Sequence, residues 1–215
     1  MRKQIKPAAA LMLGLLAAAL CAFSALAAGT PDYERDYMTR IFNSDNGLEG
    51  AAVKCICASD DGFIWVGSYT GLYCYDGTEF QKVLIDGRAI VVNDIVQDSG
   101  GDLWIGTNGD GIYRYDGSDF IQYDAVQLPD GAEVINKLYL ELDGMLFAAT
   151  KNGLFSIDPA DVEQRVTYYD ALAGKNLRDV CALNTGEKVL IEKSSEVYLL
   201  DGKALRPLNF LEQTG

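Results

Sequence analysis

The chain contains an internal repeat with a period of about 40 residues. Residues 62–80 form GFIWVGSYTGLYCYDGTEF and residues 101–120 form GDLWIGTNGDGIYRYDGSDF; with one gap, 9 of the 19 aligned positions are identical. A repeat of this length, built of short apolar runs and glycine-rich turns, is typical of a β-propeller blade. The sequence therefore predicts an all-β fold in which each copy of the repeat forms one blade.

Four copies of the unit follow one another. Each copy has three short apolar strands and a variable outer segment, and Asp-Gly or Gly-Gly pairs between the strands favour hairpins. The first strands are expected at residues 53–58, 93–97, 137–141 and 179–183. We expect a partial propeller over residues 37–215, with about four blades of a larger, seven-bladed ring at residues 53–92, 93–135, 136–177 and 178–215. Residues 37–42 are expected to form a lone strand that closes the ring as the outer edge of its last blade.

A bulky apolar residue stands in the middle of the second strand of each copy. These residues are Trp65, Trp104, Phe147 and Leu190. Their neighbours along the strand are also apolar, which indicates a sheet that is covered on both faces. We therefore predict that Trp65, Trp104 and Phe147 fill the space between adjacent blades rather than stack on a ligand. Gly67 and Gly106, two residues after the tryptophans, are predicted to allow close backbone approach.

The first 27 residues have the pattern of a secretory signal peptide. Arg2, Lys3 and Lys6 form a basic segment, an apolar stretch follows, and Ala25-Leu26-Ala27 is a small-x-small cleavage site. An uncleaved membrane anchor is the alternative, because residues 8–28 are long enough to span a bilayer. Either reading predicts an extracytoplasmic domain.

The net charge of the chain is −13. Without the three cations of the leader, the balance is 15 − 31 = −16. Such an acidic surface repels phosphate backbones, so a nucleic-acid partner is not expected. It also suits cationic or neutral ligands better than anionic ones, although a local pocket can override the net field.

Metal, cofactor and catalytic chemistry find no support in the residue pattern. The chain has no histidine and no paired CxxC, so we expect no metal site, no cofactor and no catalytic residue in this segment. Cys55, Cys57, Cys74 and Cys181 are expected to be small buried apolar residues. Aspartates recur beside glycine in the turns at Asp60, Asp61, Asp98, Asp102 and Asp143, where turn geometry is favoured over calcium binding. A glycosidase that uses two carboxylates stays open.

Propellers commonly bind ligands at one end of the central channel. The loops between the second and third strands gather there, and they carry Tyr69, Asn108, Asp110 and Lys151. An aromatic face, an amide and two charges suit a sugar or a small polar ligand, whereas Asn, Asp and Gly are also ordinary turn residues. We predict these four residues as ligand-binding.

The repeat resembles the two-component regulator propeller repeat. The matching residues of the first copy are 60–67, 71–73, 75–77 and 80, and those of the second are 101, 103–107, 111–113, 115–117 and 120. Residues 46–48 also match the lead-in of that family. The third and fourth copies match more weakly, with Phe147 and Leu190 in place of tryptophan.

The resemblance implies an extracytoplasmic sensor propeller of a bacterial signal-transduction protein. In that family a transmembrane helix and a histidine kinase or diguanylate cyclase module commonly follow the propeller, so the full-length protein is expected to be tethered to the membrane, and the ligands are often glycans. The expected partner is thus a small molecule or glycan, and a homodimer is left open. The alternatives are an exported protein-binding scaffold and a propeller hydrolase or lyase that acts on glycans.

Overall fold

The computed structural model describes residues 39–50, 52–123, 129–161 and 165–208. The chain divides into two units, Met1–Ile41 and Phe42–Gly215. In the first unit only residues 39–41 are described, and they form neither helix nor strand. The predicted leader at residues 1–27 lies outside the described residues.

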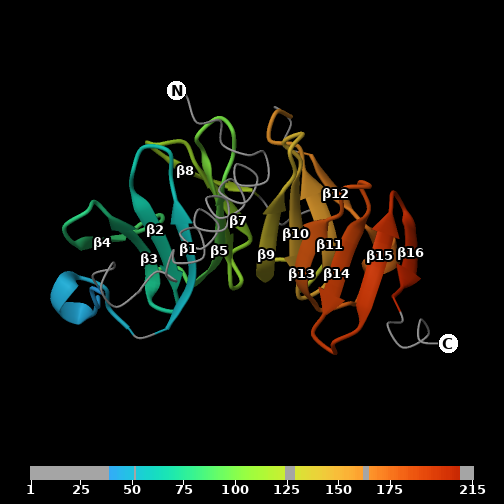
Figure 1. Cartoon of the computed structure of the whole chain (residues 1–215), viewed down its shortest axis with the longest axis horizontal. Helices are drawn as coiled ribbons and strands as arrows, with labels where there is room; N and C mark the ends of the chain where they lie inside the picture. The colour runs from blue at the N-terminus through green and yellow to red at the C-terminus, as the bar shows by residue number, and fades with distance from the viewer. Residues whose placement is uncertain (1–38, 51, 124–128, 162–164, 209–215) are drawn as a thin grey trace, which may run out of the picture. The chain divides into compact units, whose positions relative to one another are not determined.

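The second unit contains four antiparallel sheets, each a meander of four strands in chain order (Figure 1). The first sheet comprises β1 (Val53–Ala58), β2 (Ile64–Ser68), β3 (Gly71–Tyr75) and β4 (Phe80–Val83). The second comprises β5 (Val92–Gln97), β6 (Leu103–Thr107), β7 (Ile112–Tyr115) and β8 (Phe120–Tyr123). The third comprises β9 (Ile135–Leu140), β10 (Leu146–Thr150), β11 (Gly153–Ile157) and β12 (Val166–Tyr168). The fourth comprises β13 (Leu177–Ala182), β14 (Lys188–Glu192), β15 (Val197–Asp201) and β16 (Ala204–Pro207).

These sheets are propeller blades, and the predicted all-β propeller is confirmed. The first strands of successive blades, β1, β5, β9 and β13, lie side by side in chain order. Blades two to four each begin one residue before the predicted boundary, at Val92, Ile135 and Leu177. The seven-bladed total stays a prediction, because the described residues hold four blades.

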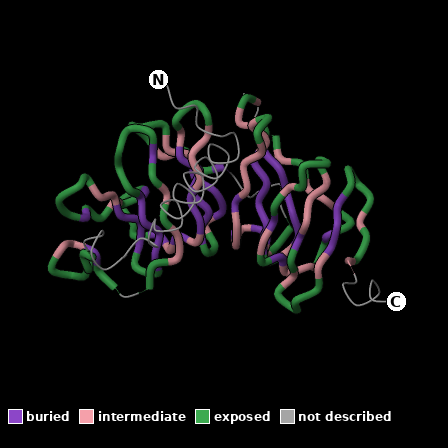
Figure 2. Tube along the Cα trace, in the orientation of Figure 1, coloured by how far each residue is buried: buried purple, intermediate pink, exposed green. Residues whose placement is uncertain are grey.

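The apolar core lies between neighbouring blades. Three clusters of buried side chains each combine residues of two successive blades. Trp65 of the first blade joins Ile95 of the second, Trp104 of the second joins Leu138 of the third, and Phe147 of the third joins Val180 of the fourth. Figure 2 shows buried residues along the strands and exposed residues at the hairpin turns. Because each blade is covered by its neighbours, apolar residues occupy both of its faces.

Gly67 and Gly106 lie where the second strand of one blade meets the first strand of the next. A Cβ atom on Gly106 would lie 2.7 Å from Cγ2 of Ile135, and one on Gly67 would lie 2.6 Å from Cγ1 of Val92. The structure therefore places glycine at two points of close contact between blades.

The recurring Asp-Gly pairs form capped turns between the third and fourth strands. In the first blade, Oδ1 of Asp76 accepts hydrogen bonds from the backbone N–H groups of Thr78 (2.8 Å) and Glu79 (3.1 Å). In the second, Oδ1 of Asp116 accepts from the two equivalent N–H groups at 2.9 Å. The following glycine, Gly77, has a φ of 99°, which favours glycine. Turn geometry thus accounts for these aspartates, and no group of three metal-ligating side chains occurs among the described residues.

The lone strand expected at residues 37–42 is not present in its described part. Residues 39–42 are irregular and lead into a 3₁₀ turn, Ser44–Asn46, while residues 37 and 38 lie outside the described residues. Phe42 packs edge-on against Tyr75 and Phe80, with ring centroids 5.1 and 5.2 Å apart. A strand needs a partner for its backbone groups, and no described strand pairs with this segment. Phe42 instead packs on the outer strands of the first blade.

The cysteines are free thiols with two different environments. Cys55, Cys57 and Cys74 are half-buried against the core between the first two blades. Burial raises the pKa of the Cys55 thiol to about 12, and the nearby Asp94 carboxylate adds to the effect. Cys181 is exposed, so the expectation of a buried residue there is wrong. Cys181 pairs with Val189 as Cys57 pairs with Trp65, so it holds the position that in the first blade faces the second blade. No blade after the fourth is among the described residues, which leaves this position exposed.

Candidate functional site

Every blade has the same β-bulge near the start of its first strand. The pairing of first and second strands skips one residue in each sheet. The four skipped residues are Lys54, Asn93, Asn136 and Arg178. An unpaired extra residue redirects its side chain out of the regular alternation of the strand, and bulges are frequent next to functional sites. The repeat therefore places one redirected polar side chain in each of the four blades.

A second set of side chains comes from the loops between the second and third strands. Ser68, Thr107 and Thr150 each end a second strand, and each hydroxyl both donates to and accepts from the backbone of the loop that follows. Thr107 Oγ1, for example, donates to Gly111 O at 2.8 Å and accepts from Asp110 N–H at 2.9 Å. The residues directly after the second strands are Tyr69, Asn108, Lys151 and Lys193. The hydroxyl groups thus fix the loops in the first three blades.

These loop residues are also held by their backbone. The N–H groups of Asn108, Lys151 and Lys193 donate to the carbonyl group that precedes the first strand of the same blade, at 3.0, 3.0 and 2.8 Å. The acceptors are Val91, Val134 and Asn176. The two sets of side chains are therefore positioned by the strand ends and not by long flexible loops.

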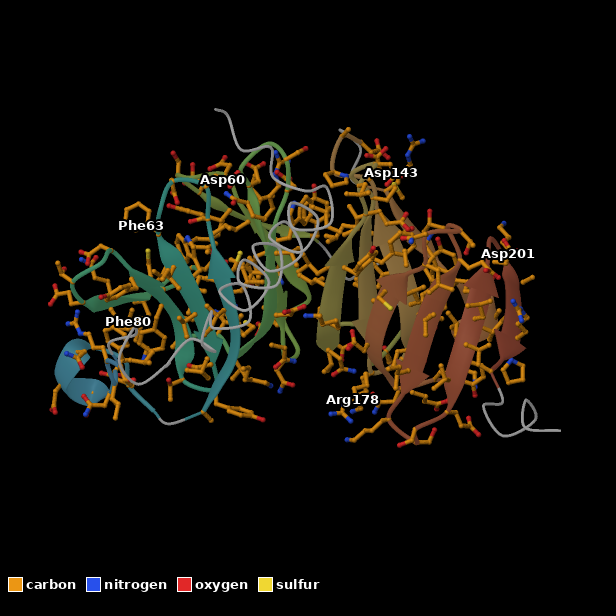
Figure 3. The ribbon with its side chains drawn as sticks, in the orientation of Figure 1. Asp60, Phe63, Phe80, Asp143, Arg178 and Asp201 are labelled. Atoms are coloured by element: carbon orange, nitrogen blue, oxygen red, sulfur yellow. The ribbon has the colours of Figure 1, made fainter. Side chains whose placement is uncertain are left out.

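Both sets line one cavity of about 880 Å³ that all four blades contribute to. Its lining consists of Val53, Lys54, Tyr69, Asn93, Asn108, Val134, Asn136, Lys151, Asn176, Arg178 and Lys193. We call this cavity the blade-end pocket. Figure 3 shows Arg178 at the lower end of the sheets, whereas Asp60 and Asp143 lie at the opposite, upper end. The pocket has the size and position expected of a propeller ligand site.

Two asparagines of the pocket link adjacent blades. Asn93 Nδ2 donates to the carbonyl of Ile135 in the third blade at 2.6 Å, and Asn136 Nδ2 donates to that of Leu177 in the fourth at 2.7 Å. Lys54 Nζ donates to Asn93 Oδ1, and it lies 4.2 Å from the centroid of the Tyr69 ring. The floor of the pocket is thus a continuous line of polar contacts that crosses from blade to blade.

The charge of the blade-end pocket is opposite to that of the chain. Of the residues that the structure describes, four cationic ones line the pocket and no Asp or Glu does. Among the described residues, the side chains of Lys151, Arg178 and Lys193 form no ion pair. The charge of the pocket lining is therefore positive, whereas the net charge of the chain is −13.

Three of the four predicted ligand-binding residues come together in the pocket. Tyr69, Asn108 and Lys151 line it, whereas Asp110 does not. Asp110 instead pairs with Arg88 at 3.3 Å. Whether the three residues bind a ligand stays a prediction.

Sequence reasoning missed the bulge residues and two others, Asn176 and Lys193. A signal for the bulge residues exists, because in each copy a polar residue stands two positions before an apolar residue of the first strand: Ile56, Ile95, Leu138 and Val180. Reading the four copies in register at that position finds all four bulge residues.

The fold and the pocket define a β-propeller with a polar cavity at one end of its described blades. Residues 47–70 and 87–109 match the family described as two component regulator propeller. The resemblance to that repeat is thereby confirmed for the part of each of the first two blades that runs through its second strand. A comparison with curated protein sequences finds no match.

Similar solved structures include extracellular domains assigned to two-component systems, lyases and a component of a secretion system. The extracellular domain assigned to a hybrid two-component system of B. thetaiotaomicron has a TM-score of 0.63 and 20% identity, over 75% of this chain and 23% of that one. A virginiamycin B lyase from Staphylococcus aureus has a TM-score of 0.61 and 13% identity, over 75% of this chain and 57% of that one. PorZ, a surface component of the type-IX secretion system of Porphyromonas gingivalis, has a TM-score of 0.55 and 16% identity, over 74% and 27%. The chain therefore spans a minor part of the first of these proteins, and the likeness concerns the fold.

Within the described ranges, no helix has the length and apolar character needed to cross a bilayer.

Proposed function

We propose that this chain is the ligand-sensing propeller of a bacterial signal-transduction protein, located outside the cytoplasm. The output module, a histidine kinase or a diguanylate cyclase, is encoded beyond residue 215. Three findings support the proposal: the match to the two-component regulator propeller family, the fold shared with extracellular domains of two-component systems, and the pattern of a signal peptide. Ligand binding on the outer side is then converted into a change in the output module.

The observation that carries the proposal is the composition of the blade-end pocket. The same two positions of every blade, the bulge residue and the residue after the second strand, contribute to one cavity. A ligand that contacts several blades at once changes the free energy of their mutual arrangement. Signalling requires that the ligand bind two arrangements with different affinity. A site shared by the four described blades supports the proposal, because the contacts of a ligand there depend on how the blades are arranged.

Sensing is favoured over catalysis by the residues available. One of the S. aureus lyase structures is a catalytically inactive form in which a histidine is replaced by alanine. The present 215 residues contain no histidine, the side chain most often used as a general base. The pocket instead presents amides and cations, which suit recognition.

The coding sequence beyond residue 215 provides the first test. A membrane span followed by a kinase or cyclase domain supports the proposal. A stop codon soon after the ring closes contradicts it, and would favour an exported scaffold.

The second test measures output in cells that are offered candidate saccharides. We expect the Tyr69→Ala variant to lose most of the response, since the Tyr69 side chain is 60% exposed in the pocket. Phe63→Ala is the matched control, because Phe63 is also an exposed aromatic residue but lies at the other end of the blade. An equal response of both variants and the parent protein would show that the pocket is not the sensing site.

A further inference from the structure

We infer that the blade-end pocket binds an acidic saccharide, a sugar chain that carries carboxylate or sulfate groups. The inference rests on the proposed sensing function and specifies its ligand class. It departs from the expectation raised by net charge, which favours cationic or neutral ligands. The reason is that four cationic residues, Lys54, Lys151, Arg178 and Lys193, line the pocket itself.

Many acidic residues lie at the end of the blades opposite the pocket. Because the strands of each blade are antiparallel, the turns between first and second strands and those between third and fourth strands lie at one end, and the pocket loops lie at the other. Acidic residues of the far-end turns include Asp60, Asp61, Asp76, Asp98, Asp116 and Asp143. Figure 3 shows Asp60 and Asp143 at that end and Arg178 at the other. The lining of the pocket holds no Asp or Glu among the described residues, although Asp110, Glu192 and Glu196 lie at the same end of the blades.

Among the described residues, the cations of the pocket form no ion pair, whereas several cations elsewhere do. Elsewhere Lys82 pairs with Glu49 at 2.9 Å, Lys137 with Asp94 at 3.0 Å and Lys188 with Glu141 at 2.9 Å. Lys137, one of these paired cations, directly follows the bulge residue Asn136 but does not line the pocket.

In the part of the chain that the structure describes, Lys151, Arg178 and Lys193 have no such partner although they share one cavity. Like charges gathered in a concave site repel one another, and an anionic group held between them removes that repulsion and accepts charge-assisted hydrogen bonds.

The remaining lining favours a saccharide over a free inorganic anion. Asn93, Asn108, Asn136 and Asn176 supply amide groups, which can donate to and accept from hydroxyl groups. The exposed ring of Tyr69 offers an apolar face against which a sugar ring can pack. A cavity of about 880 Å³ also exceeds the need of a single small ion. Cations, amides and an aromatic face together match a ligand with both anionic and hydroxyl groups.

Binding of matched oligosaccharide pairs to the full-length protein tests the inference. One pair is oligogalacturonide and its methyl ester, a second is a sulfated glycosaminoglycan fragment and its desulfated form, and inorganic sulfate alone is the third arm. We expect the acidic member of at least one pair to bind about tenfold or more tightly than its neutral counterpart, with affinity falling as salt rises. Isothermal calorimetry at two salt concentrations measures both.

Charge-removing variants assign the effect to the pocket. Lys151→Gln and Lys193→Gln together should weaken acidic saccharide binding about tenfold or more, because each removes a charge-assisted hydrogen bond. Lys203→Gln is the matched control, since Lys203 is exposed in the turn between β15 and β16 at the far end. Circular dichroism checks that the variants fold. We expect them to fold, because among the described residues neither Lys151 nor Lys193 forms a side-chain ion pair.

The outcomes separate the inference from the function on which it rests. Equal or tighter binding of the neutral members overturns the acidic ligand and leaves sensing intact. Sulfate alone binding as tightly as the acidic saccharides overturns the saccharide and assigns a free anion. Acidic saccharide binding that the two lysine changes do not weaken overturns the pocket assignment. Absence of binding by every probe counts against ligand sensing as well.

Discussion

A buried tryptophan brings an indole N–H group that needs an acceptor, and the first two repeats differ in supplying one. Nε1 of Trp104 donates to Oδ2 of Asp98 at 2.8 Å. Nε1 of Trp65 is buried without a partner among the described residues, and the position equivalent to Asp98 is Ser59. Ser59 forms its hydrogen bonds within its own turn, to Asp61 and to the Phe63 carbonyl. One residue difference between repeats therefore decides whether the indole is satisfied.

Asp98→Ala should destabilise the protein by about 1–3 kcal/mol, because it leaves the Trp104 N–H group buried and unpaired. The change also removes the acceptor for the N–H groups of Gly100 and Asp102. Ser59→Ala is the matched variant and should cost less, since the Trp65 N–H group gains nothing from Ser59. Urea unfolding of both variants measures the difference, and equal losses would contradict this account.

Trp104→Ala should cost about 3–5 kcal/mol, as expected for a large aromatic side chain removed from a packed core. Trp104 is 0% exposed and packs against both its own blade and the third. Phe63→Ala, at a partly exposed aromatic residue, serves as the control in the same unfolding measurement. A loss below roughly 1 kcal/mol at Trp104 would show that it is not part of the core between blades.

At the scale of elements, turns and bulges carry the regularity of the blade. The Asp-Gly turns close the third and fourth strands by hydrogen bonds from backbone N–H groups to the aspartate carboxylate. The bulges occur once in every first strand and turn a side chain toward the pocket. Turns set where strands end, and bulges set which polar residue leaves the regular alternation.

The capped turn of the first blade predicts a pH dependence of stability. The Thr78 hydroxyl and the N–H groups of Thr78 and Glu79 hold the pKa of Asp76 at about 2, below its ordinary value of 3.8. A lowered pKa in the folded state means that the stabilisation is fully present above pH 3.8 and is lost as the pH falls toward about 2. Asp76→Asn should therefore be less stable than the parent protein at neutral pH. The difference in unfolding free energy between the two proteins should vanish as the pH approaches about 2. Urea midpoints across this range measure it, and a constant difference would contradict the assignment.

At the scale of the whole molecule, stability comes from contacts between neighbouring blades. Each of three apolar clusters joins two successive blades. A buried polar link adds to the second of these interfaces: Asp94 of the second blade accepts from the Leu138 N–H group at 2.8 Å and pairs with Lys137. Nearest-neighbour stacking of this kind means that damage at one interface should loosen mainly the two blades that form it.

Asp94→Ala tests that locality. The change leaves the Leu138 N–H group buried without its acceptor, at a cost of about 1–3 kcal/mol. Hydrogen exchange should rise in β5 and β9 and change little in β14 and β15. A uniform rise over all four blades would show that the blades open as a single unit.

The strand order, the blade repeat and the buried aromatic positions follow from the sequence, because they depend on local apolar runs and turn residues. The pocket is different. In the third and fourth blades, the apolar pattern predicts that the first strand starts at Lys137 and at Asp179. The strands β9 and β13 instead begin at Ile135 and Leu177, and they therefore contain the bulge residues Asn136 and Arg178. A bulge is a property of pairing between two strands, so the pattern along one strand does not show it.

Asp110 is a second residue whose place the sequence pattern does not show. It shares a loop with Asn108, but it pairs with Arg88, a residue of the connection between the first two blades, and so leaves the pocket lining. The sequence by itself determined the blades, since short apolar runs form their strands and Asp-Gly pairs form their turns. Only the tertiary structure decided which polar side chains share a cavity and how far they lie from the acidic turns, because both depend on pairing between strands and stacking between blades.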